Sequence, residues 1–82
     1  MRITPDQCRG ARALLQMTQE QLAALSGVSL RTIAHFEKGE RQPIPANIAA
    51  LRRAFEEAGI EFIPENGGGA GVRFRTPRSL PS

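Results

Sequence analysis

The chain has 82 residues and a formal net charge of +3 at neutral pH, and 40% of its residues are hydrophobic. This length supports one domain and leaves no room for a second. The lone cysteine, Cys8, excludes an intrachain disulfide and the usual thiolate-based zinc site. No apolar run has the length of a signal peptide or a membrane span, so we expect a cytoplasmic protein without membrane contact, and the cationic excess favours a polyanionic partner.

The first helix is predicted from a capping box. Thr4 precedes Pro5, and Gln7 follows three residues after Thr4, so that the Thr and Gln side chains can each bond to a backbone N–H group. We expect this helix to run to about Gln16. Cys8 lies on its apolar stripe and is interpreted as a small core residue.

Two short helices follow. Thr18 and Gln21 repeat the capping pattern and begin a helix of about two turns that stops at Gly27. Ser29 caps a third helix that extends through Lys38. Neither short helix can bury both of its faces alone, so we expect them to pack as a unit.

The last third of the chain changes period. Pro45 begins a long helix up to Gly59, after which apolar and charged residues alternate as they do in strands. We predict a β-hairpin over residues 60–75 with a glycine-rich turn, and a disordered tail over residues 76–82. The domain organisation is therefore 1–59 for the helical domain, 60–75 for the hairpin extension and 76–82 for the tail.

The second and third predicted helices carry the residue types of a helix-turn-helix. Ala23 is a small residue where the helices would cross, and Gly27 lies in the turn. The apolar residues that would lock the two helices are Leu22, Val28, Ile33 and Phe36. A helical hairpin without a nucleic-acid role remains the alternative.

The stretches 18–29 and 33–39, followed by Pro43, resemble the signature of the Cro/phage-repressor (XRE) family. The resemblance spans about residues 7–55. It implies a mainly α fold, a four-helix lambda-repressor-like helix-turn-helix domain, to which the C-terminal β-hairpin is an addition. It also implies a DNA-binding transcriptional regulator that needs no cofactor or metal and is not an enzyme. Gln16 departs from the family, where Gly is common, so we expect the turn after the first helix to be built differently.

Several residue roles follow from the resemblance. Arg12 and Glu37 match positions that form a buried ion pair in the family, a structural role. Gln19 matches a residue that commonly anchors to a DNA phosphate. The expected phosphate contacts are Thr18, Gln19, Lys38 and Arg41.

The exposed face of the third helix is the candidate base-reading surface. If Ile33 and Phe36 point inward, the outward residues are Ser29, Leu30, Arg31, Thr32 and His35. The planar fork of Arg31 can reach O6 and N7 of a guanine in the major groove. The alternative for Arg31 is an ordinary solvated surface arginine, and His35 has no plausible nucleophile partner for catalysis.

The hairpin needs a surface to cover its apolar side, because an isolated two-stranded sheet is marginal in water. Either the fourth helix of the same chain or a second subunit provides it. We favour a homodimer whose interface includes Ile60, Phe62, Val72 and Phe74. A dimer would read a partly palindromic operator, because one recognition helix contacts too few base pairs for specificity.

The sequence therefore predicts a sequence-specific regulator, a repressor or an activator, that binds double-stranded DNA. The rival interpretation is a protein-interaction module, antitoxin-like or anti-activator, that uses the same fold to bind a regulatory protein partner. The polar residues of the third helix argue against it, because interface cores favour aromatic residues. Binding of structured RNA is a third interpretation, but the chain lacks the aromatic residues on which RNA bases usually stack.

Overall fold

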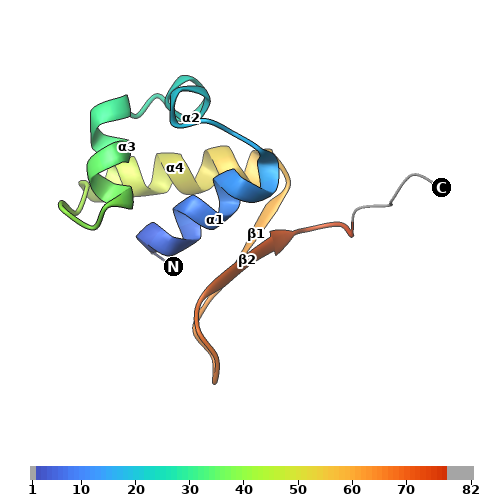
Figure 1. Ribbon diagram of the computed structural model, residues 1–82. Coiled ribbons are helices and arrows are strands. Elements are labelled where there is room, and N and C mark those ends of the chain that lie inside the picture. Colours follow the sequence, from blue (N-terminus) through green and yellow to red (C-terminus); the bar gives the residue numbers. More distant parts are fainter. Residues whose placement is uncertain (1, 78–82) are drawn as a thin grey trace.

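The computed structural model describes residues 2–77, which form four helices followed by two strands (Figure 1). The elements are α1 (Pro5–Leu15), α2 (Gln19–Ser26), α3 (Leu30–Glu37), α4 (Pro45–Glu57), β1 (Ile60–Ile63) and β2 (Gly71–Phe74). This architecture confirms the predicted fold class. Of the predicted tail, residues 78–82 lie outside the described residues.

Side-chain hydrogen bonds fix the starts of α1, α2 and α3, as the sequence predicts. The Thr4 hydroxyl accepts from the backbone N–H of Gln7, and the Gln7 side chain accepts from the backbone N–H of Thr4 at 2.9 Å. Thr18 and Gln21 form the same box at the start of α2, and Ser29 caps α3. Each of these side chains satisfies backbone groups that a helix end leaves unpaired.

The turn after α1 is built without glycine. Gln16 adopts a left-handed conformation with φ 52°, and it is the only non-glycine residue with positive φ in the described part of the chain. Behind it the Met17 N–H donates to the Arg12 carbonyl at 2.9 Å, which closes the end of the helix. The expected departure at Gln16 is therefore a side chain held in the conformation that glycine adopts more readily.

The hydrophobic core lies between the helices and continues under the hairpin. The buried apolar residues are Ile3, Cys8, Ala11, Leu22, Val28, Ile33, Phe36, Ile48, Leu51, Ala54, Phe55, Ile60 and Phe62. Every helix and β1 contribute to this cluster. The hairpin therefore completes the core of the same domain and does not form a separate unit.

Of the two surfaces considered for the hairpin, its own chain covers β1. Ile60 and Phe62 are 0% and 8% exposed, and the Phe62 ring meets Phe55 of α4 edge-on with centroids 5.9 Å apart. Their side chains are therefore covered by the core of their own chain and leave little surface for the predicted dimer interface. Val72 and Phe74 pack against the same core but are only half-buried.

Two features of α1 hold the hairpin in place. Gln7, only 3% exposed, donates from its side-chain amide to the carbonyls of Ile63 (3.2 Å) and Gly71 (3.0 Å), which face each other across the sheet. Gly10 faces β2, where a Cβ atom would come within 3.1 Å of Val72 Cγ2. One turn of α1 thus binds both strands and allows the helix to approach them closely.

We expect Phe62→Ala to lower the free energy of unfolding by about 3–5 kcal/mol, because it leaves a cavity beside Phe55 in the core. Urea denaturation followed by circular dichroism measures this change. Arg73→Ala, on the exposed face of β2, is the matched control and should cost within about 0.5 kcal/mol. A loss at Phe62 as small as that of the control would mean that the hairpin does not complete the core.

Candidate nucleic-acid interface

The second and third helices form a locked helix-turn-helix. α2 ends at Ser26 and is capped by Gly27, whose φ of 76° turns the chain, and the Ser26 hydroxyl accepts from the Val28 N–H at 3.1 Å. The four predicted locking residues are all buried, and Ala23 packs against them. The angle between α2 and α3 is therefore set by core packing, so the outer face of α3 is presented rigidly.

The predicted base-reading residues lie on this outer face. Ile33 and Phe36 are fully buried on the inner side of α3, which leaves Arg31 exposed and Leu30 41% exposed on the other. Ser29 is exposed, and Thr32 and His35 are half-buried. The Ser29 hydroxyl donates to the Thr32 hydroxyl at 2.9 Å, so these two polar groups are held together at the start of α3.

A cleft of about 500 Å³ runs beside α3. Arg31, His35 and Arg41 line it, together with Gln42 and Asn47 from the segment before α4 and its first turn. Sequence analysis did not identify Gln42 and Asn47, because their distance from α3 depends on the path of the loop. The only signal in the sequence is that Gln42 directly follows Arg41.

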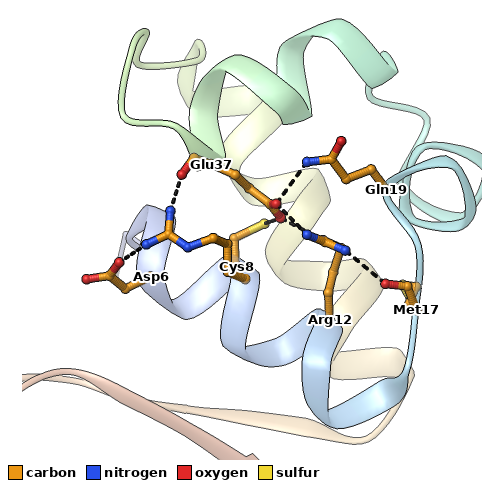
Figure 2. Close-up of polar contacts among 7 residues, drawn as sticks. Asp6, Cys8, Arg12, Met17, Gln19 and Glu37 are labelled. Atoms are coloured by element: carbon orange, nitrogen blue, oxygen red, sulfur yellow. Dashed lines mark hydrogen bonds and ion pairs between the residues drawn. The ribbon is translucent and has the colours of Figure 1, made fainter.

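Glu37, at the end of α3, is the centre of a buried polar network (Figure 2). Its carboxylate accepts two hydrogen bonds from Arg12, Nε to Oε2 at 2.8 Å and Nη2 to Oε1 at 2.6 Å. It also accepts from the Gln19 amide at 2.9 Å and from the Cys8 thiol at 3.1 Å. The Glu37 backbone carbonyl accepts from Arg9. The predicted Arg12–Glu37 pair is therefore present and joins α1 to α3, and Gln19 adds α2 to the network.

The network shifts the titration of its members. Burial alone would raise the pKa of Glu37, but the hydrogen bonds from Arg12, Gln19 and Cys8 outweigh it and hold that pKa below its ordinary value. The hydrogen bond to Glu37 raises the pKa of Arg12. Burial, and then the hydrogen bond to Glu37, raise the pKa of the Cys8 thiol. Cys8 is thus an inert neutral donor.

Gln19 has a structural role that sequence analysis missed. Its side-chain amide, expected to face a phosphate, donates one hydrogen bond to Glu37 and so ties the start of α2 to the end of α3. No local pattern indicated the inward bond, because it depends on how α2 and α3 pack.

The three cations predicted near DNA carry unopposed charge. Arg31, Lys38 and Arg41 are exposed, and none of them forms an ion pair with another residue in the range 2–77. They lie on α3 and on the segment that follows it. Positive charge that no carboxylate neutralises is available to a phosphate backbone.

This fold and this surface define a DNA-binding helix-turn-helix domain. The model of the helix-turn-helix family HTH_3 matches residues 9–61, more than half of the chain, and the chain belongs to this family of Cro/C1-type regulators. Its members are DNA-binding regulators and not enzymes. A search of curated proteins gave no match. Within residues 2–77 no helix is long and apolar enough to cross a membrane.

We expect Glu37→Ala to lower the free energy of unfolding by about 3–5 kcal/mol, because Arg12 would stay partly buried without its counter-charge. Thermal or urea denaturation measures it. Glu40→Ala, in the exposed segment after α3, is the control and should change stability by less than about 0.5 kcal/mol. Equal losses for the two variants would show that the network is dispensable.

The same network predicts a pH dependence. Because the pKa of Glu37 is lower in the folded than in the unfolded chain, its stabilisation is complete above the ordinary carboxyl value of 4.5 and is lost as the pH falls toward the folded value. Glu37→Gln should remove this contribution, so the wild-type and variant stabilities should converge in acid. Parallel stability curves down to acid pH would contradict the prediction.

Proposed function

We propose that the protein is a transcriptional regulator that inserts α3 into the major groove of a partly palindromic operator as a homodimer. Its family implies DNA binding. The observation that supports insertion of α3 into the major groove is the division of this helix into two sides. Ile33 and Phe36 lie on its buried side, and exposed Arg31 lies on its outward side. A rigidly mounted helix with polar groups at its outer face suits base edges.

Base recognition rests on the outer face of α3. Arg31 would donate two hydrogen bonds to O6 and N7 of a guanine, and exposed Leu30 would contact a thymine methyl group. Ser29, Thr32 and His35 supply hydroxyl and imidazole groups on the same side. His35 and Arg31 line one cleft, so both can reach the same wall of the groove.

Phosphate contacts would orient the domain. Thr18 and Gln19 stand at the start of α2, where helix N–H groups favour anions. Lys38 and Arg41 follow α3 and bring exposed, unpaired charge. Gln42 and Asn47 extend this set, because they line the same cleft as Arg41.

Dimerisation would use residues 60–75. Support comes from the half-buried side chains of Val72 and Phe74 and from the outer edges of β1 and β2, which pair with no further strand within residues 2–77 and are prone to pair. In Figure 1 the hairpin and α3 lie at opposite ends of the molecule, so a hairpin contact leaves α3 free. Two copies would then read two half-sites.

Arg31→Ala should weaken binding to the operator by about 1–3 kcal/mol and relax the preference at one base pair, because a bidentate base contact is lost. Footprinting of genomic DNA supplies the operator, and mobility shifts against operators with single substitutions measure the change. Lys38→Ala is the matched control: it should weaken binding to every sequence and reduce the salt dependence by about one unit. Equal loss on all sequences for Arg31→Ala would assign Arg31 to the phosphates.

The dimer is tested with the full chain on two half-sites placed about 10 base pairs apart. Affinity should exceed that for one half-site by about 10²–10⁴, because the second contact is intramolecular. A control DNA with about five extra base pairs puts the half-sites on opposite faces of the duplex and should lose most of the gain. A chain that sediments as a monomer at micromolar concentration and gains nothing from the second half-site would refute the dimer.

A further inference from the structure

Three exposed arginines away from α3, namely Arg2, Arg53 and Arg75, form no ion pair within residues 2–77, and two of them line the same cleft. Four ion pairs neutralise other arginines, namely Arg9 with Asp6, Arg12 with Glu37, Arg52 with Glu56 and Arg73 with Glu61. Arg2 and Arg53 are exposed and form no ion pair within the described chain, yet they belong neither to α3 nor to the segment that follows it. The DNA interface proposed above does not use them.

Arg2 and Arg53 line one cleft, a hollow of about 370 Å³ beside α4. Arg52 and Glu56 also line it, but their 3.1 Å ion pair neutralises both charges. The N-terminal segment and α4 thus bring two positive charges to one place, and no carboxylate of the cleft is left to balance them.

The wall of this cleft is partly apolar. Pro45 and Ala49 both line it, and both are exposed to solvent. The cleft has no residue in common with the cleft beside α3, which is lined by Arg31, His35 and Arg41 among others. A ligand could therefore occupy it while α3 contacts DNA.

We propose that this cleft binds an acidic, partly apolar segment of a partner protein. Arginine forks match carboxylates with two parallel hydrogen bonds, so Arg2 and Arg53 suit Asp or Glu side chains. Pro45 and Ala49 can pack against an apolar side chain of the ligand and bury it from water. A phosphate backbone has no such apolar side chain. The volume is within the range of small binding pockets and fits a few side chains.

The test uses the full chain labelled with ¹⁵N and a synthetic peptide of alternating Glu and Leu as the probe. Saturable shifts of the Ala49 and Arg53 amide signals are expected, with weaker binding at high salt. Replacing both arginines, Arg2→Glu and Arg53→Glu, should lower peptide affinity at least tenfold and leave the mobility shift with DNA unchanged. Lys38→Glu is the matched control: it should weaken DNA binding and leave peptide binding intact.

Several results would overturn the proposal. Peptide shifts confined to α3, or no saturation, would remove the cleft as an acidic-peptide site. If a duplex shifts the Ala49 and Arg53 signals, or if the double variant weakens the mobility shift, the cleft contacts DNA instead. A chain that binds the peptide at α4 but no DNA would keep this inference and refute the function proposed for α3, so the two failures are distinguishable.

Discussion

The buried carboxylate of Glu37 is the constraint on which the DNA-facing half of the molecule depends. A carboxylate that is 4% exposed is tolerated only when its oxygens are fully hydrogen-bonded, and here α1 and α2 supply every donor. Because Glu37 is the last residue of α3, these bonds fix the end of that helix against two others. These hydrogen bonds to Glu37 therefore determine the orientation of the outer face of α3.

α1 connects the Glu37 network to the hairpin. Its first turn carries Gln7, which binds two carbonyls at the loop end of the hairpin, while Cys8 and Arg12 bind Glu37. One helix of 11 residues therefore contacts the hairpin through one set of polar groups and α3 through another. The hairpin lies outside the segment that resembles the family signature, yet it is joined to the shared domain by both core packing and hydrogen bonds.

The distribution of charge gives the surface its separate roles. Ion pairs on α1, on α4 and across the hairpin neutralise most arginines away from α3. Within residues 2–77 the exposed cations near α3 form no ion pair, and neither do Arg2, Arg53 and Arg75. A modest net charge of +3 is thereby distributed unevenly over the surface.

The sequence by itself determined the helix starts, the helix-turn-helix and the inward and outward sides of α3, because these follow from side-chain spacings of three and four residues. The Arg12–Glu37 pair was also predictable, but only through the family resemblance. Tertiary structure alone decided that Ile60 and Phe62 complete the monomer core and that Gln7 holds the hairpin across separations of 56 and 64 residues. Such contacts depend on which distant segments the path of the chain brings together. An alternating strand pattern predicts which side of the strand is apolar, but it does not predict which segment covers that side.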